Sequence, residues 1–228
     1  VSKERSAGGK RLHRTAHPVR IPPAPALREP RQDSTARATR RAGLPSTLPL
    51  YLEFMAALGG VVAAAVTPRR QGPEIDLGAA FELLDFLCAT GISGIALLGS
   101  TGEFIHFTIE ERIRLVKLGV KRSRVPVVAG VSHSALDGAV LLAREAADAG
   151  AAALMLAPPY FFSYSQEEIR DFYFAFAEQA GGMPIVIYNI PQFASRIEPE
   201  TAAELLASGA FEGIKDSSGS WTDFTRLL

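Results

Sequence analysis

The sequence has a single cysteine and no long apolar run, and these two absences exclude several classes of protein. Cys88, at an apolar position of an expected helix, has no second cysteine to pair with, so an internal disulfide framework is excluded. We therefore expect a reducing compartment, the cytoplasm. No stretch approaches the roughly 20 apolar residues that a membrane-spanning helix needs, so we expect no association with a membrane.

Net charge is also absent, but the zero sum hides an asymmetry along the chain. Residues 1–50 carry eleven Lys or Arg and three Asp or Glu, whereas the remainder carries thirteen basic and twenty-one acidic residues. Phosphate binding needs clustered positive charge, so the acidic balance of the larger part argues against nucleic acid as a partner. The 228 residues, 47% of them hydrophobic, suffice for the core of one ordinary domain.

Residues 1–54 contain few large apolar side chains and many Arg and Pro. Such a segment cannot bury enough surface to offset its ordering entropy, so we expect a basic, disordered extension ahead of a folded part over residues 55–228. It is an Arg-rich targeting peptide, a basic arm for an acidic partner, or translated sequence upstream of a start at Met55. The ordered pattern begins a few residues after Met55, which favours the third explanation.

From residue 60 onward, short apolar runs typical of strands start about 30 residues apart, the length of one βα unit. These runs are Gly60–Val66, Gly94–Leu98, Val125–Gly130, Ala152–Ala157, Pro184–Tyr188 and Phe211–Lys215. They show no alternation, which is typical of a parallel sheet covered on both faces. The segments between them are amphipathic, as expected for helices.

The boundaries of the expected helices are marked by capping patterns. Thr108–Glu111 and Ser165–Glu168 have the capping-box pattern, in which a hydroxyl and a carboxylate each satisfy a free backbone N–H, and Ser134–Asp137 is a weaker version. Gly91 and Gly150, like Gly209, follow helical stretches where a left-handed residue is needed.

Repeated βα units leave two options, a doubly wound open sheet or a (β/α)8 barrel. Thr-Pro-Arg-Arg follows the first strand at Val66, with no Gly-rich dinucleotide fingerprint there, which favours the barrel. Six strands are present where a barrel needs eight. We therefore expect a TIM (β/α)8 barrel truncated after about six βα units, a piece of a longer chain.

The first candidate functional motif, Gly99-Ser-Thr-Gly-Glu103, follows the second strand. In parallel α/β architectures, functional groups gather at the carboxyl ends of strands. The small residues let backbone N–H groups face inward, and the hydroxyls of Ser100 and Thr101 add donors, so the loop suits a carboxylate or phosphate. The alternative is an ordinary Gly-rich turn.

Two further motifs follow the fifth and sixth strands, Tyr188-Asn-Ile-Pro191 and Ile214–Gly219, which contains Lys215. An oriented tyrosine hydroxyl can move protons. A desolvated lysine amine loses its charge more easily, which suits Schiff-base chemistry with a carbonyl substrate. The alternatives are a tyrosine packed with its hydroxyl at the surface and a lysine at a strand exit.

Together, the motifs GSTGE, YNIP and GIKDSSG resemble, in order and spacing, the signatures of the dihydrodipicolinate synthase/N-acetylneuraminate lyase family. Supporting matches are Thr67-Pro68, the TxEER-like Thr108–Arg112, and Pro159–Phe161. The resemblance covers Gly60 to Leu228, the whole part expected to fold. It implies a TIM barrel with pyruvate-dependent class I aldolase chemistry.

The resemblance also implies roles for individual residues. Lys215 would form a Schiff base with the ketone of pyruvate or another 2-oxo acid, and Tyr188 would relay protons during carbon–carbon bond cleavage or formation. Ser100 and Thr101, with Gly99, would hold the carboxylate. No metal or other cofactor would be needed, and the protein would be a homo-oligomer, a tetramer by resemblance. His106 and His133 follow the second and third strands, where they would either line the pocket rim or be structural, and we favour the structural role.

Two departures from the family pattern bear on the substrate. Dihydrodipicolinate synthases usually have a second tyrosine where this chain has Phe161, and an arginine where it has Phe193. The first change removes a relay hydroxyl, and the second removes the cation expected to bind an amino-aldehyde's carboxylate. With Phe161 as a substrate-binding residue, we expect a lyase acting on a 2-oxo-3-deoxy sugar acid or an N-acetylneuraminate-like substrate.

Other functions stay open at this point. One is condensation of the 4-hydroxy-tetrahydrodipicolinate synthase type. Another is a non-catalytic barrel paralogue, which would not need to keep both Lys215 and Tyr188. A third is a phosphate-binding isomerase, whose usual phosphate site follows strands seven and eight.

Overall fold

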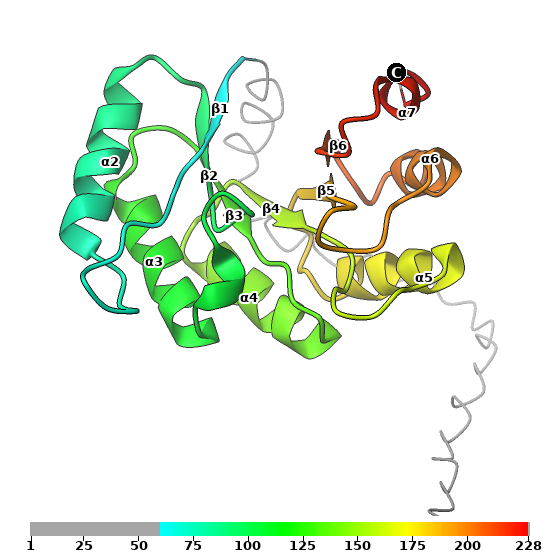
Figure 1. The fold of residues 1–228 in the computed structure, drawn as a ribbon, viewed down its shortest axis with the longest axis horizontal. Coiled ribbons are helices and arrows are strands. Elements are labelled where there is room, and N and C mark those ends of the chain that lie inside the picture. The colour runs from blue at the N-terminus through cyan, green and yellow to red at the C-terminus, as the bar shows by residue number, and fades with distance from the viewer. Residues whose placement is uncertain (1–59, 228) are drawn as a thin grey trace, which may run out of the picture. The chain divides into compact units, whose positions relative to one another are not determined.

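Residues 60–227, the part of the chain that this computed structural model describes, form six parallel strands alternating with helices (Figure 1). The strands are β1 (Val62–Ala64), β2 (Gly94–Leu97), β3 (Val127–Gly130), β4 (Ala153–Leu156), β5 (Ile185–Asn189) and β6 (Gly213–Asp216). The helices are α2 (Leu77–Ala89), α3 (Ile109–Arg122), α4 (Leu136–Asp148), α5 (Gln166–Ala177), α6 (Pro199–Ala207) and α7 (Trp221–Thr225), with a short 3-10 turn at Phe104–His106. The expected basic extension, residues 1–54, lies outside the described residues.

The order of the strands decides between the two fold classes that the sequence left open. Each strand pairs in parallel with the next along the chain, in the order β1-β2-β3-β4-β5-β6. A doubly wound sheet would reverse its direction of growth at an inner strand. Here every unit adds on the same side, so the sheet is the arc of a (β/α) barrel with the helices on its outer face (Figure 1). The predicted barrel class is confirmed, and all six expected strands are present to within two residues.

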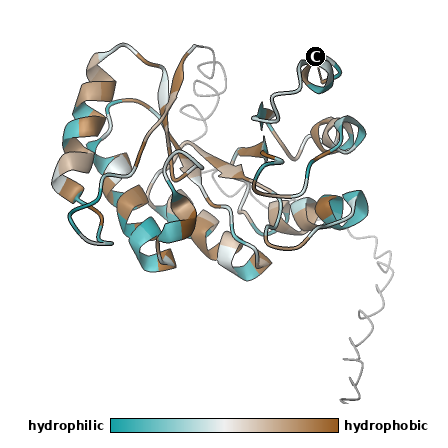
Figure 2. Ribbon diagram, in the orientation of Figure 1, coloured by the Kyte–Doolittle hydropathy of each residue, from teal (hydrophilic) through white to brown (hydrophobic). Residues whose placement is uncertain are grey.

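Both faces of the sheet are apolar, which explains the absence of alternation in the sequence. In β4, Leu154 and Leu156 belong to the core between sheet and helices, whereas Ala153 and Met155 belong to a second cluster on the inner face. Figure 2 shows largely hydrophobic strands beside helices that carry both hydrophilic and hydrophobic residues. Cys88, on α2, packs against the outer core as expected.

Both strong capping boxes are present. Thr108 and Glu111 exchange their hydrogen bonds at the start of α3, and Ser165 and Glu168 do so at the start of α5. The hydrogen bond from the Ser165 backbone N–H also lowers the pKa of the Glu168 carboxyl. None of the helices in the described residues is long and apolar enough to cross a membrane.

The weaker capping pattern at Ser134–Asp137 was a wrong prediction. Helix α4 begins one residue later than that pattern requires, with Ala135 at its N-cap and no side-chain cap. The reason is that the Ser134 hydroxyl donates instead to the Tyr160 carbonyl at 2.9 Å. The expected left-handed glycine after α2 is present, since Gly91 has φ +77°.

Candidate functional site

The pairing of β5 with β6 places Lys215 beside Tyr188. The two residues are partners in the parallel register, so their side chains leave the same face of the sheet. The Lys215 Nζ lies 4.0 Å from the centroid of the Tyr188 ring. The Lys215 side chain therefore extends over the face of the Tyr188 ring.

The Tyr188 hydroxyl is oriented by a hydrogen bond to another strand end. Its oxygen lies 2.8 Å from the Ser100 Oγ, which the loop after β2 brings across the inner face. Tyr188 is buried, with 2% of its surface exposed. A buried hydroxyl with one fixed hydroxyl partner has the geometry that proton transfer requires. The three motif residues Lys215, Tyr188 and Ser100 therefore form one connected group.

The loop that carries Ser100 is held in a constrained conformation. Leu98 is 1% exposed and has φ +57°, an uncommon value for a branched side chain. The Leu98 carbonyl lies against Gly130, where an added Cβ would be only 2.1 Å from the Leu98 oxygen. The Thr67 hydroxyl donates to the Gly102 carbonyl at 2.8 Å, which ties the loop to the exit of β1. Such strain is common at functional sites because the surrounding packing sustains it.

The other two predicted residues of this loop take different positions from Ser100. Gly99 is buried, and the nearest atom to a Cβ added there would be the Met155 Cε at 3.1 Å. The Thr101 side chain is exposed and does not line the adjacent cavity. Ser100 is therefore the hydroxyl of the pair that contacts Tyr188.

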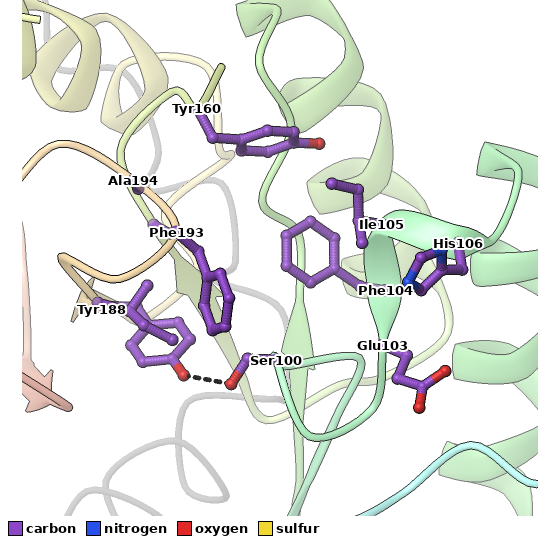
Figure 3. A pocket seen from close by; sticks show the side chains of 11 residues that line it. Ser100, Glu103, Phe104, Ile105, His106, Tyr160, Tyr188, Phe193 and Ala194 are labelled. Carbon is purple, nitrogen blue, oxygen red and sulfur yellow. Dashed lines mark hydrogen bonds between the residues drawn. The ribbon is translucent and has the colours of Figure 1, made fainter. Parts of the chain in front are cut away.

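A cavity of about 190 Å³ opens beside the Tyr188–Ser100 pair (Figure 3). Most of its wall is apolar. The lining residues are Ser100, Glu103, Phe104, Ile105, His106, Ala157, Tyr160, Tyr188, Ile190, Phe193 and Ala194. Phe104 was not recognised from the sequence, although the apolar run that follows GSTGE was the available signal.

Phe161 lies outside this cavity. Its φ of +88° turns the side chain outward, where 88% of it is exposed and its ring meets that of Phe162 edge to face at 4.9 Å between centroids. It lines a neighbouring hollow, which shares Ile105, Tyr160 and Phe193 with the first. A role for Phe161 in substrate binding stays a prediction.

The two histidines of the region differ in their surroundings. His106 has an exposed side chain and lines the cavity, which is the rim position that the sequence offered as the alternative to the favoured structural role. The His133 Nδ1 faces the backbone N–H of Ala135 at 3.0 Å, a local contact of the structural kind that was expected.

Arg112, the last residue of the Thr108–Arg112 match, is buried beside Phe104, and this burial was not predicted from the sequence. Arg112, 2% exposed, donates through Nη2 to the carbonyls of Gly130 at 3.2 Å and Ser132 at 3.0 Å. Its guanidinium carbon lies 5.0 Å from the Phe104 ring centroid. Burial lowers the pKa of Arg112 to about 10, because water no longer solvates the charge. In the sequence, Arg112 lies among other charged residues, a pattern that is typical of an exposed helix face and does not indicate burial.

The chain belongs to the dihydrodipicolinate synthetase family, whose model matches residues 57–228. It is 37% identical over 164 residues to a 4-hydroxy-tetrahydrodipicolinate synthase of Syntrophus aciditrophicus, a match that covers 71% of this chain and 56% of the relative. The family resemblance seen in the sequence is thus confirmed. The chain spans about three-fifths of the length of the curated relatives that it matches.

Solved structures agree with this assignment. The 2-keto 3-deoxygluconate aldolase from Picrophilus torridus is 34% identical, with a TM-score of 0.71 over 74% of this chain and 62% of that one. YagE, a prophage protein of the family from E. coli K12 solved in complex with pyruvate, is 25% identical, with a TM-score of 0.70 over 74% of this chain and 57% of that one. The relatives place the chain in a family of lyases and aldolases with a TIM-barrel fold.

Proposed function

We propose that this protein is a Schiff-base aldolase that breaks or forms a carbon–carbon bond with pyruvate as one partner. The observation that carries the proposal is the group of contacting residues at the carboxyl ends of β2, β5 and β6. The Lys215 amine lies against the Tyr188 ring, and the Tyr188 hydroxyl is hydrogen-bonded to Ser100. An amine nucleophile and an oriented proton relay are the two groups that this chemistry needs.

In the cleavage direction, the neutral Lys215 amine adds to the C2 ketone of a 4-hydroxy-2-oxo acid. The resulting carbinolamine loses water to form an iminium, with Tyr188 moving the protons. The C4 hydroxyl then gives up its proton, the C3–C4 bond breaks, and its electron pair moves into the iminium to form an enamine. Protonation at C3 and hydrolysis release pyruvate and free the lysine.

The Ser100 hydroxyl has two tasks in this proposal. It fixes the Tyr188 hydroxyl, and the loop that carries it offers backbone N–H groups to the carboxylate of the 2-oxo acid. Thr101, which is exposed, stays only a predicted further donor. Holding the carboxylate aims the ketone carbon at the amine, which turns a bimolecular attack into an oriented one. YagE, solved with pyruvate, supports pyruvate as the common partner.

The remaining part of the substrate distinguishes the members of the family. The sequence predicts a 2-oxo-3-deoxy sugar acid, and similarity to a 2-keto 3-deoxygluconate aldolase supports this class. Similarity to 4-hydroxy-tetrahydrodipicolinate synthases supports the alternative condensation. A non-catalytic paralogue is disfavoured by the joint presence of Lys215 and Tyr188. The homo-oligomer and the cytoplasmic location stay predictions.

Reductive trapping tests the reaction class. Incubation of the intact protein with pyruvate and borohydride should leave a covalent adduct on the peptide that contains Lys215, detected by mass spectrometry. Lys215→Ala should abolish both the adduct and turnover, whereas Lys117→Ala, on the exposed face of α3, should leave both unchanged. An adduct on another lysine, or an active Lys215→Ala variant, would refute the proposal.

A further inference from the structure

The cavity beside Tyr188 is walled by aromatic rings from three loops. Phe104, Tyr160 and Phe193 face one common space in Figure 3, with Ile190 and Ala194 completing the wall. The rings of Phe104 and Tyr160 pack edge to face, with centroids 5.8 Å apart. This packing fixes two of the rings against each other, so the wall has a defined shape.

The polar groups among the described lining residues lie at the margins of this space, and the His106 imidazole lies on the side of Phe104 away from Tyr188 in Figure 3. The hydroxyls of Ser100 and Tyr188 lie at one end of it and are hydrogen-bonded to each other. The Glu103 carboxylate pairs with Arg69 at 3.4 Å and points away from the rings in Figure 3. The Tyr160 hydroxyl lies at the far end from that of Tyr188. A chain of hydroxyl groups placed against these rings would lose water without finding partners.

The position of the cavity indicates which part of a substrate would enter it. Lys215 is not among the lining residues, but Tyr188 contacts it and also lines the cavity. The cavity thus begins at the proton-relay hydroxyls and not at the amine. In the proposed reaction, the C4 hydroxyl must also lose its proton, and the Tyr188 hydroxyl that serves the carbinolamine step is the group that we place beside it. The group attached to C4 would then extend into the cavity.

Building on the proposed Schiff-base chemistry, we propose that the cavity binds an apolar group on C4 of the 4-hydroxy-2-oxo acid, a branched alkyl group or an aromatic ring. Apolar cavities of roughly 150 Å³ hold a molecule of benzene's size, and this one has about 190 Å³. Cleavage breaks the C3–C4 bond, the C4 hydroxyl loses its proton and becomes an aldehyde, and C3 gains a proton. The products are pyruvate and an apolar aldehyde, and no oxidant is consumed.

This substrate class differs from the polyhydroxylated acids expected from the sequence, and a matched pair of aldols separates the two. The intact protein is assayed for pyruvate release, coupled to lactate dehydrogenase, with 4-hydroxy-2-oxo-4-phenylbutanoate and with 2-keto-3-deoxygluconate. The phenyl compound should have a kcat/KM higher by about tenfold or more, the scale of burying one ring-sized apolar group. Equal or better turnover of the sugar acid would overturn the inference.

A pair of variants tests whether the aromatic wall is the cause. Phe193→Ser should lower kcat/KM for the phenyl substrate by about tenfold, chiefly through KM. Phe86→Ser is the matched control, because Phe86 has a similar exposure, 64% against 71%, but lies on α2 and not in the cavity. Phe86→Ser should change neither kcat/KM nor KM for the phenyl substrate. Equal effects of the two substitutions would contradict a specific role for the wall.

Borohydride trapping with pyruvate itself separates failure of this inference from failure of the proposed function. Pyruvate carries no C4 group, so the unchanged protein should form the Lys215 adduct whether or not the cavity prefers apolar groups. Thermal melts of Phe193→Ser and Phe86→Ser show whether both variants fold. An adduct together with a preference for the sugar acid would overturn only the apolar specificity. Absence of the adduct in the unchanged protein would overturn both.

Discussion

Asn189 and Asp216 are joined by a short hydrogen bond one residue beyond Tyr188 and Lys215. The Asn189 Nδ2 donates to the Asp216 Oδ1 at 2.6 Å, and Asn189 is 3% exposed. The Asn189 Oδ1 accepts from the Ile197 N–H at 3.1 Å, and the Asp216 Oδ2 accepts from the Ser218 hydroxyl at 2.6 Å. Because Tyr188↔Lys215 and Asn189↔Asp216 are successive register pairs, this bond joins the ends of the two strands directly beside Tyr188 and Lys215.

Asn189→Asp should destabilise the protein in a pH-dependent way. It removes the donor and sets two carboxylates against each other, so one of them must keep a proton and its pKa is raised. A raised folded-state pKa means that the stability is retained at low pH and lost as pH rises through that value. Thermal melts should therefore show a loss of roughly 1–3 kcal/mol at pH 8, with partial recovery toward pH 5.

The double substitution N189D/D216N is the control for that prediction. It exchanges the carboxylate and the amide between the two strands, so each hydrogen bond to Ile197 and Ser218 keeps an acceptor and one donor remains between the strands. The melting temperature and the pyruvate adduct should both return toward the values of the unchanged protein. A double variant no better than Asn189→Asp would show that the bond does not hold the strands in place.

How far the sequence could predict these features depended on how local the signals are. The six strands and two capping boxes were predictable because apolar runs and cap residues act over a few positions. The Asn189–Asp216 bond was not, because it joins positions 27 residues apart whose relation depends on the strand register. The aromatic wall likewise assembles Phe104 and Tyr160 from different loops, and no periodicity in the sequence records their meeting.

Tyr188→Phe and Ser100→Ala should have different effects on the two stages of the reaction. Tyr188→Phe keeps the ring against Lys215 but removes the relay hydroxyl, so some borohydride adduct should remain while turnover falls by roughly two or more orders of magnitude. Ser100→Ala leaves the hydroxyl of Tyr188 in place without its partner, so turnover should fall less. Single-turnover adduct formation and steady-state pyruvate release measure the two stages. Full turnover in Tyr188→Phe would contradict the relay.

Arg112→Met should destabilise the protein. The carbonyls of Gly130 and Ser132 lose their donor, and each buried acceptor left unsatisfied costs about 1–3 kcal/mol. Arg114→Met, two residues along the same helix on its exposed side, is the matched control and should change stability by no more than about 0.5 kcal/mol. Denaturant unfolding of the intact protein measures both. Equal effects would mean that the buried hydrogen bonds contribute nothing specific.

The intact protein should not condense pyruvate with aspartate semialdehyde at a useful rate. That substrate carries a carboxylate and an ammonium group, and Phe193 presents an apolar ring where relatives of the synthase type are expected to present an arginine. A carboxylate placed against the Phe104 and Phe193 rings would lose its hydration without a cation to replace it. Coupled assay of the condensation product should show no activity under conditions in which pyruvate forms its Lys215 adduct.

Restoring the cation makes that prediction sharper. Phe193→Arg places a guanidinium at the cavity wall, where it can bind a carboxylate with two parallel hydrogen bonds, so condensation with aspartate semialdehyde should become measurable. Phe162→Arg is the matched control, since Phe162 is similarly exposed, at 66% against 71%, but does not line this cavity. Phe162→Arg should gain no condensation activity with aspartate semialdehyde. Efficient condensation by the unchanged protein would show that Phe193 does not exclude the amino-aldehyde. An equal gain in both variants would assign the effect to net charge and not to the position of the cation in the wall.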